Sequence, residues 1–200
     1  EYDFNIWAYA RVDTVKKSYL DTLKKAGVQW LALGIESGNG VVRKDVIKGR
    51  FTDVNIADLV KEIQDAGINV IGNYIFGLPE DNTDTMRETL ELAKDLNCEF
   101  ANFYCSMAYP GSKLYLDAIR DGMTLPETYT GYSQHSYDMR PLDTKHIDAA
   151  EVVRFRDAAF NEYYENPKYL DFIKQKFGEE THNRIVKMCQ HKLKRKIIGD

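Results

Sequence analysis

The first half of the chain alternates between apolar residues at helical spacing and short continuous apolar runs. A helical stripe, a helix-ending residue and an apolar run follow one another in this order three times. Gly27, Gly67 and Asn97 occupy the helix-ending position, where a left-handed backbone is expected. The pattern predicts four buried strands with a helix between each consecutive pair, at residues 4–10, 28–35, 68–76 and 98–107.

Helices that alternate with buried strands favour a parallel sheet joined by crossover helices, as in a doubly wound sheet or a (β/α) barrel. A closed barrel of this kind has about eight strands. Four strands therefore indicate a partial barrel, an open sheet or a piece of a longer fold, and the start at Glu1 instead of Met favours a piece. We expect residues 1–125 to form an α/β fold with about four parallel strands, which the resemblance described below assigns to the C-terminal part of a TIM-like (β/α) barrel.

Residues 126–200 are expected to form a loop and a helical extension packed on this α/β core. A Tyr-rich loop comes first, and helical patterns follow at residues 147–165, 168–177 and 180–197. No linker rich in Gly, Ser or Pro separates these helices from the core, which argues against a separate domain. The basic side chains of the last helix, Arg195 among them, are expected to face solvent.

The composition limits the partners and the setting of the protein. A net charge of −4 and a pI near 5.6 give no overall attraction to nucleic acid. No apolar run reaches the ~18 residues of a membrane span. The three cysteines, Cys98, Cys105 and Cys189, have spacings that fit neither a disulfide framework nor a tight metal motif. We expect Cys98 and Cys105 to be buried thiols, a reducing, cytoplasmic setting, and no metal ligands in this chain.

Polar residues follow the ends of two predicted strands, in the segments LALGIESGNG at 31–40 and GNYIFGLPEDN at 72–82. Because the carboxyl ends of parallel strands share one edge of the sheet, these segments predict a single ligand pocket. Glu36 is expected either to accept hydrogen bonds from ligand hydroxyls or to cap the next helix. Lys48 is expected either to pair with a ligand carboxylate or phosphate, or to lie on the surface.

Further candidates lie along the last two predicted strands. Asn73 is a polar residue inside an apolar run, so its amide needs a partner, either a ligand or a group across the sheet. The turn after Gly77 lacks bulky side chains, so main-chain groups there can reach a flat ligand such as a purine. Tyr104, Ser106 and Tyr109 alternate toward the end of the last strand, where they either line the pocket mouth or belong to the core.

Four segments taken together resemble the radical SAM superfamily. They are WAYARVD at 7–13, LALGIESGNG at 31–40, GNYIFGLPEDN at 72–82 and FYCSMAYPGSKLY at 103–115. Their order and spacing are most similar to a branch of Fe–S oxidoreductases that often carries an N-terminal cobalamin-binding domain. The resemblance implies a partial (β/α) barrel, and a parent enzyme that cleaves S-adenosylmethionine reductively to a 5′-deoxyadenosyl radical.

The same resemblance implies that part of the family's plan lies outside this chain. In the family, a CxxxCxxC loop after the first strand holds a [4Fe–4S] cluster, and this sequence corresponds to the fold from its third strand onward. The cluster ligands would then be missing here, and cobalamin would be bound, if at all, through a missing N-terminal domain. The resemblance thus implies a fragment that is inactive alone, from a parent that acts on an unidentified small-molecule substrate.

Individual roles are implied in the same way. Glu36 corresponds to the residue that approaches the ribose of S-adenosylmethionine, and Lys48 to the basic residue near its methionine carboxylate. The strand segment 73–77 corresponds to the backbone that holds adenine, although some relatives have Asp where this chain has Asn73. Two further residues, Arg11 near the end of the first predicted strand and Tyr104 on the last one, are implied only as pocket candidates. The cofactor-binding residues that the resemblance implies are Arg11, Glu36, Lys48, Asn73, Ile75, Phe76, Gly77 and Tyr104.

Two other functions stay open from the residues alone. One is a cluster-free binding or scaffolding module with a barrel-like fold. The other is a barrel lyase or isomerase that uses Glu36 and Lys48 as acid and base. A partial barrel also leaves an unpaired edge at its first strand, which we expect to be covered by a C-terminal helix, the N-terminus or a second copy of the chain.

Overall fold

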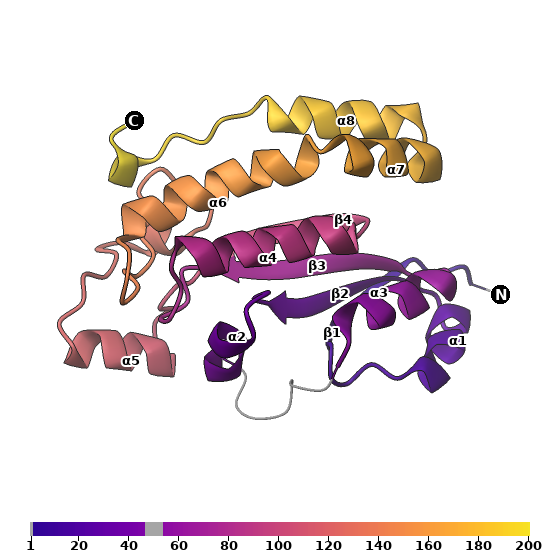
Figure 1. The fold of residues 1–200 in the computed structure, drawn as a ribbon, viewed down its shortest axis with the longest axis horizontal. Helices are drawn as coiled ribbons and strands as arrows, with labels where there is room; N and C mark the ends of the chain where they lie inside the picture. The colour runs from indigo at the N-terminus through magenta and orange to yellow at the C-terminus, as the bar shows by residue number, and fades with distance from the viewer. Residues whose placement is uncertain (1, 47–53) are drawn as a thin grey trace. The chain divides into compact units, whose positions relative to one another are not determined.

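The first half of the chain forms a single β-sheet with helices between its strands (Figure 1). The structure is a computed structural model and describes residues 2–46 and 54–200. Its strands are β1 (Ile6–Arg11), β2 (Val28–Glu36), β3 (Asn69–Phe76) and β4 (Phe100–Cys105). They lie in the order β1-β2-β3-β4, and the pairs β1–β2 and β2–β3 run parallel. The α/β class and the four strands predicted from the sequence are confirmed.

The strand order distinguishes between the two α/β architectures considered. A doubly wound sheet reverses its strand order at a switch point, whereas a (β/α) barrel adds each new strand beside the previous one. The four strands here follow one another without reversal. The sheet therefore has the order of a barrel segment, with β1 and β4 as its two edges.

The chain divides into two compact units. The first comprises Glu1–Tyr74 and Glu88–Asn102, and the second comprises Ile75–Arg87 and Phe103–Asp200. Helices of the first half of the chain are α1 (Lys17–Lys25), α2 (Gly40–Val46), α3 (Ile56–Asp65) and α4 (Thr83–Leu96). The last part of α4 belongs to the first unit.

Left-handed residues follow three of these helices, as the spacing predicts. Gly27, Gly67 and Asn97 have φ angles of 95°, 76° and 47°. Each turns the chain out of a helix shortly before the next strand begins, so these positions fix where the αβ units join. At the other end of α3, Asn55 Oδ1 accepts hydrogen bonds from backbone N–H groups of the first turn at 3.1 and 3.3 Å.

Aromatic side chains are exposed along β1 and before it. Trp7 and Tyr9 are 53% and 77% exposed and stack with their ring centroids 6.0 Å apart. Tyr2 and Phe4, which precede the strand, are also exposed and stack at 5.8 Å. These aromatic side chains are therefore open to solvent, and the expected cover of the β1 edge stays a prediction.

The second unit contains a helical part with a buried cluster of tyrosines. Its elements are α5 (Lys113–Arg120), the 3₁₀ turn η1 (Tyr129–Tyr132), α6 (Ala149–Tyr164), α7 (Pro167–Phe177), α8 (Glu179–Cys189) and the 3₁₀ turn η2 (Lys196–Ile198). Tyr163, Tyr164 and Tyr169 are buried, with ring centroids 4.9 to 5.2 Å apart. The hairpin of α7 and α8 turns at Gly178, whose φ is 86° (Figure 1). Aromatic packing therefore joins α6 to this hairpin.

The last helix is shorter than the sequence predicts. α8 ends at Cys189, and residues 191–195 have no helical structure. Arg195 is 0% exposed, so the prediction that it faces solvent is wrong. Its guanidinium donates hydrogen bonds to side chains and carbonyls that lie far away in the sequence. Residues 191–195 therefore form a non-helical segment instead of continuing α8.

Cys98 and Cys105 are buried, as predicted, and Cys189 is buried as well; all three are free. Within the described ranges, the structure has no helix that is both long and apolar enough to cross a membrane.

Candidate functional site

Glu36 ends β2 in an uncommon backbone conformation. Its φ is 67°, in the left-handed region that non-glycine residues seldom adopt, and the pairing of β2 with β3 shifts between Gly34 and Glu36. The side chain lies over Gly34, because a Cβ at position 34 would be 2.6 Å from Glu36 Oε1. A glycine at position 34 is therefore needed for the carboxylate to occupy this place.

The Glu36 carboxylate is half-buried, and the described part of the chain gives it no hydrogen-bonding or ion-pair partner. Burial raises the pKa of Glu36 above that of an ordinary glutamate. A desolvated carboxylate without donors is costly, and so is a left-handed glutamate. These two features together mark Glu36 as a ligand-binding candidate.

Asn39, and not Glu36, caps the helix that follows. Asn39 Oδ1 accepts hydrogen bonds from the backbone N–H groups of Val41 and Val42 at 3.0 and 3.1 Å. The alternative in which Glu36 serves as the helix cap is therefore not what the structure has.

The loop that carries these residues is held firmly against α4. Gly38 N donates to Thr89 Oγ1 at 2.9 Å, and the hydroxyls of Ser37 and Thr89 are 3.2 Å apart. A Cβ at position 38 would lie 2.7 Å from the carbonyl oxygen of Glu88, so the loop and the helix touch backbone to backbone. This contact fixes the direction in which the chain leaves β2.

Asn73 has partners on both sides within the sheet. Its Nδ2 donates to the carbonyl of Leu33 at 3.2 Å, and its Oδ1 accepts from Asn102 Nδ2 at 2.9 Å. These two bonds agree with the alternative of a structural hydrogen bond across the sheet. Arg11, which is in register with Gly34 on the next strand, forms a two-pronged ion pair with Asp13 at 2.8 and 3.0 Å.

In the second unit, the segment from Ile75 to Gly77 is mostly buried. Ile75 is half-buried and Phe76 is 0% exposed, with its ring 5.7 Å from that of Phe103. The carbonyl oxygen of Phe76 accepts a hydrogen bond from Ser106 N at 2.8 Å. Phe76 is thus a core residue whose side chain is not available to a ligand in this structure.

Gly77 has a packing role that the sequence does not reveal. Its φ is 76°, and a Cβ there would lie 2.6 Å from Val152 Cγ1 in α6. The absence of a side chain at this turn therefore has a structural reason, which is the close approach of α6.

Asp81 organises the turn after β3, and the sequence assigned it no role. It is buried, with Oδ2 accepting from Leu78 N at 2.9 Å and Oδ1 accepting from Thr85 Oγ1 at 2.7 Å. Burial raises the pKa of Asp81, and these hydrogen bonds oppose the rise. The sequence signal available is a carboxylate directly before a helix start, which is typical of a turn or cap.

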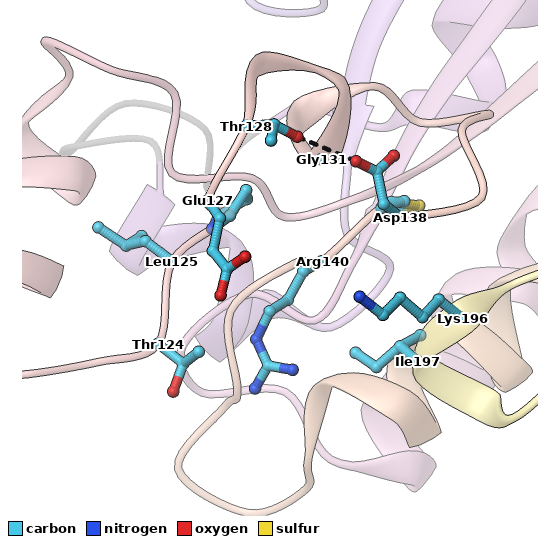
Figure 2. A pocket seen from close by; sticks show the side chains of 11 residues that line it. Thr124, Leu125, Glu127, Thr128, Gly131, Asp138, Arg140, Lys196 and Ile197 are labelled. Atoms are coloured by element: carbon cyan, nitrogen blue, oxygen red, sulfur yellow. Dashed lines mark hydrogen bonds between the residues drawn. The ribbon is translucent and has the colours of Figure 1, made fainter.

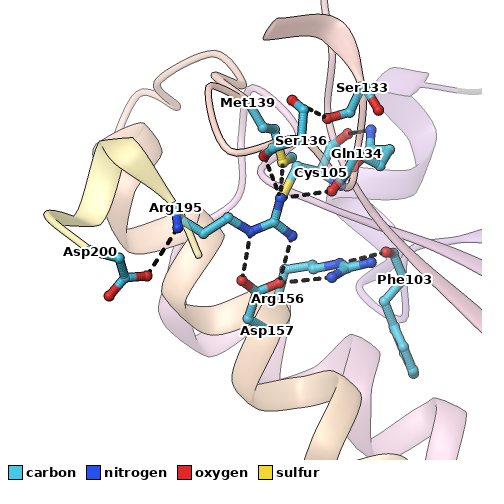
Figure 3. Close-up of polar contacts among 10 residues, drawn as sticks. All are labelled: Phe103, Cys105, Ser133, Gln134, Ser136, Met139, Arg156, Asp157, Arg195 and Asp200. Carbon is cyan, nitrogen blue, oxygen red and sulfur yellow. Dashed lines mark hydrogen bonds and ion pairs between the residues drawn. The ribbon is translucent and has the colours of Figure 1, made fainter. Parts of the chain in front are cut away.

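Side chains close the outer edge of β4 (Figure 3). Gln134 pairs with the backbone of Cys105, accepting from its N–H at 2.9 Å and donating to its carbonyl at 3.0 Å. Arg156 Nε donates to the carbonyl of Phe103 at 2.8 Å. These three backbone groups point to the same side of the strand, so amide and guanidinium groups replace a further strand there. No pattern in the sequence indicated either partner.

The remaining predicted residues vary in their surroundings. Tyr104 is half-buried, Ser106 is buried and Tyr109 is exposed, with its ring 6.3 Å from that of Tyr132. Lys48 lies outside the described residues.

The cysteines do not fit an iron–sulfur cluster. Their spacing along the chain does not match that of iron–sulfur cluster ligands, and burial raises the pKa of the Cys98 and Cys105 thiols to about 12. Among the described residues, no group of three or more His, Cys, Asp or Glu side chains is placed to hold a metal. A cluster would therefore need ligands other than these.

Comparison with known proteins identifies the family. The family model of the Radical SAM superfamily matches residues 8–93, which include most of β1, all of β2 and β3, and most of α4. Over these residues the chain matches the radical SAM superfamily, and the resemblance noted in the sequence is confirmed.

Individual relatives differ in their named reactions. The uncharacterized methyltransferase PH0819 of Pyrococcus horikoshii is 28% identical over 92% of this chain and 39% of its own length. The anaerobic magnesium-protoporphyrin IX monomethyl ester cyclase of Cereibacter sphaeroides is 24% identical over 76% of this chain and 24% of its own. The chain thus spans less than two fifths of the length of these curated relatives.

Solved structures are also similar, and one of them is the following. The radical S-adenosylmethionine methyltransferase TsrM from Kitasatospora setae, with cobalamin and a [4Fe-4S] cluster bound, gives a TM-score of 0.46 at 18% identity. The match covers 50% of this chain and 20% of that chain.

Proposed function

We propose that this chain is the C-terminal part of the radical SAM domain of a longer Fe–S enzyme and contributes part of its S-adenosylmethionine site. The observation that carries the proposal is Glu36, a strained and half-buried carboxylate that ends β2 within the family match and has no partner among the described residues. Hydroxyl groups of a ribose would supply the donors that this carboxylate lacks. We infer that Glu36 accepts them when the cofactor is bound.

The chemistry of the whole enzyme would depend on groups outside these residues. A [4Fe–4S] cluster held elsewhere in the parent would supply the electron that cleaves S-adenosylmethionine to the 5′-deoxyadenosyl radical. The relatives include both a methyltransferase and a cyclase by name, so we assign neither the substrate nor the reaction type. Cobalamin would belong to a domain outside this chain, in a protein that we expect to be cytoplasmic.

The other role assignments remain predictions. They are Lys48 near the methionine carboxylate, the main chain of Asn73–Gly77 along adenine, and Arg11 and Tyr104 beside the cofactor or substrate. For Asn73 and Phe76, the existing hydrogen bonds of the amide and the carbonyl leave less capacity for a ligand. The division into a barrel part at residues 1–125 and an extension at residues 126–200 likewise remains a prediction.

The family match favours the enzyme over the two other functions considered. A scaffolding module would not need a desolvated carboxylate at a strand end. A lyase that uses Glu36 with Lys48 has no support from the described residues, since Lys48 lies outside them.

Glu36→Ala in the parent enzyme, with its cluster reconstituted, should weaken binding of S-adenosylmethionine about tenfold or more. A hydrogen bond to a charged group contributes roughly 1.5–3 kcal/mol, and ~1.4 kcal/mol corresponds to a factor of ten. Equilibrium titration calorimetry measures the change in affinity directly.

The affinity of the wild-type enzyme for S-adenosylmethionine should also depend on pH. Because burial raises the pKa of Glu36, this affinity should fall on acidification at a higher pH than it would with an ordinary glutamate.

Asp21→Ala is the matched control, since Asp21 is an exposed carboxylate on α1. It should leave the dissociation constant unchanged. Equal affinities for Glu36→Ala, Asp21→Ala and the wild type would rule out the ribose role.

We also propose that the β1 edge pairs with a strand outside the described residues, from the parent or from a second copy of this chain. Edge strands with exposed apolar side chains tend to associate, and Trp7 and Tyr9 are exposed here. The isolated chain should therefore self-associate in sedimentation velocity, whereas Trp7→Lys/Tyr9→Lys should sediment as a monomer. Tyr129→Lys, at an aromatic that is 87% exposed elsewhere, should not dissociate it. A monomeric wild-type chain would contradict pairing between copies.

A further inference from the structure

A cavity of about 440 Å³ in the second unit has no role in the function proposed above (Figure 2). Its volume falls in the range of roughly 300–1,000 Å³ that is usual for small-molecule sites. The lining residues come from one continuous loop, between Thr124 and Arg140, and from the C-terminal segment at Lys196 and Ile197. We call it the Arg140 cavity.

Backbone hydrogen bonds fix the walls of the Arg140 cavity. Arg140 N donates to the carbonyl of Gly131 at 3.0 Å, and Lys196 N donates to the carbonyl of Tyr137 at 2.8 Å. Gly131 allows the loop to close on itself, since a Cβ there would be 2.6 Å from Pro126 Cβ. The two cationic residues are thus held by main-chain contacts that do not depend on their side chains.

Arg140 brings an unsatisfied donor to this site. Its Nε is buried and has no hydrogen-bond partner among the described residues. Figure 2 shows the Arg140 side chain between those of Glu127 and Lys196, with the Lys196 ammonium extended toward it in this view. A buried guanidinium N–H without an acceptor is costly, so an acceptor from a ligand would relieve it.

The two carboxylates of the cavity differ in their availability. Asp138 Oδ2 accepts hydrogen bonds from the hydroxyls of Thr128, at 3.0 Å, and Thr130, and these bonds lower the pKa of Asp138. Asp138 is therefore engaged by the loop itself. Glu127 is then the carboxylate that competes with a bound anion for Arg140 and Lys196.

We propose that the Arg140 cavity binds a small molecule through an anionic group, a carboxylate or a phosphate, held by Arg140 and Lys196. Arg is suited to this task because its planar donors match the oxygens of either anion. Apolar surface from Leu125, Met139 and Ile197 would contact the rest of such a ligand.

The test uses the 200-residue chain and needs no cluster or cofactor, so its outcome is independent of the radical SAM proposal. Inorganic phosphate and succinate are titrated in parallel at constant ionic strength, with backbone amide shifts followed by NMR. We expect saturable shifts confined to residues 124–140 and 196–197, with a dissociation constant on the order of millimolar. The tighter-binding probe identifies the anion class.

Arg140→Gln and Lys196→Gln should each weaken binding about tenfold or more. Glu127→Gln should strengthen it, because it removes the competing negative charge. Lys192→Gln, which makes the same charge change in the exposed part of the C-terminal segment, should leave the affinity unchanged. Shifts that do not saturate with either probe, or equal affinities in Arg140→Gln and Lys192→Gln, would overturn the proposal.

Discussion

Arg195→Met is expected to lower the free energy of unfolding by about 3 kcal/mol and the melting temperature by about 6–12 °C. Arg195 Nε and Nη2 donate to the two carboxylate oxygens of Asp157 at 3.0 and 3.1 Å (Figure 3). Its Nη1 donates to the carbonyls of Gln134 and Ser136, both at 3.0 Å. Met fills a similar volume but leaves these acceptors without their donor.

The size of the effect follows from the burial of the two partners. The Arg195 side chain is 0% exposed and that of Asp157 is 26% exposed. Removing one member of a buried ion pair costs roughly 3–5 kcal/mol. Water reaches part of Asp157, so the lower end of this range is expected.

Lys194→Met provides the control, since it removes the same charge from an exposed neighbour. It should change the stability by less than about 0.5 kcal/mol. Urea denaturation followed by circular dichroism measures both variants. Faster hydrogen exchange near Gln134 in Arg195→Met alone would show that the contacts of Arg195 hold the loop around Gln134 against β4. Equal stability of the two variants would contradict a stabilising role of the buried Arg195 pair.

Gly77→Ala is expected to destabilise the chain by roughly 2–4 kcal/mol through two separable causes. The first cause is the backbone, because φ is 76° at this position. The second is steric, because the new Cβ would lie 2.6 Å from Val152 Cγ1 and 3.1 Å from its Cγ2. The two causes call for different controls.

Gly111→Ala isolates the backbone cause. Gly111 has a φ of 84°, and a Cβ there would have no neighbour within 4 Å. It should cost only the roughly 1–2 kcal/mol of a left-handed alanine. Gly77→Ala should cost clearly more in the same denaturation experiment.

Gly77→Ala/Val152→Ala isolates the steric cause. Removing the Val152 methyl groups makes room for the new Cβ, so the double variant should be more stable than the sum of the two single changes predicts. Strict additivity would show that Val152 is not the obstacle.

Much of the fold could be predicted because its signals are local. Helical and strand spacing placed the four strands to within a few residues, and left-handed conformations at Gly27, Gly67 and Asn97 matched the predicted helix ends. Stop residues and apolar periodicity act over a few neighbouring residues, so the sequence contains them directly.

The candidate site was less accessible to sequence reasoning. Glu36 was identified by its place after a buried strand, but its left-handed φ and the room left by Gly34 required coordinates. Asn73 was expected to need a partner, and only the structure identified Leu33 and Asn102 in that role. Register across a sheet joins residues far apart in sequence, which a single chain pattern does not specify.

The sequence by itself determined the alternation of helices and strands, the family and the strand-end segments around Glu36 and Gly77. The tertiary structure alone decided that Gln134 and Arg156 close the β4 edge, that Trp7 and Tyr9 are exposed and that Arg195 is buried. The physical reason is the same in each case. Periodicity reports whether a side chain prefers water or the interior, whereas a polar group's partner is fixed only when distant segments pack together and one of them offers a matching donor or acceptor.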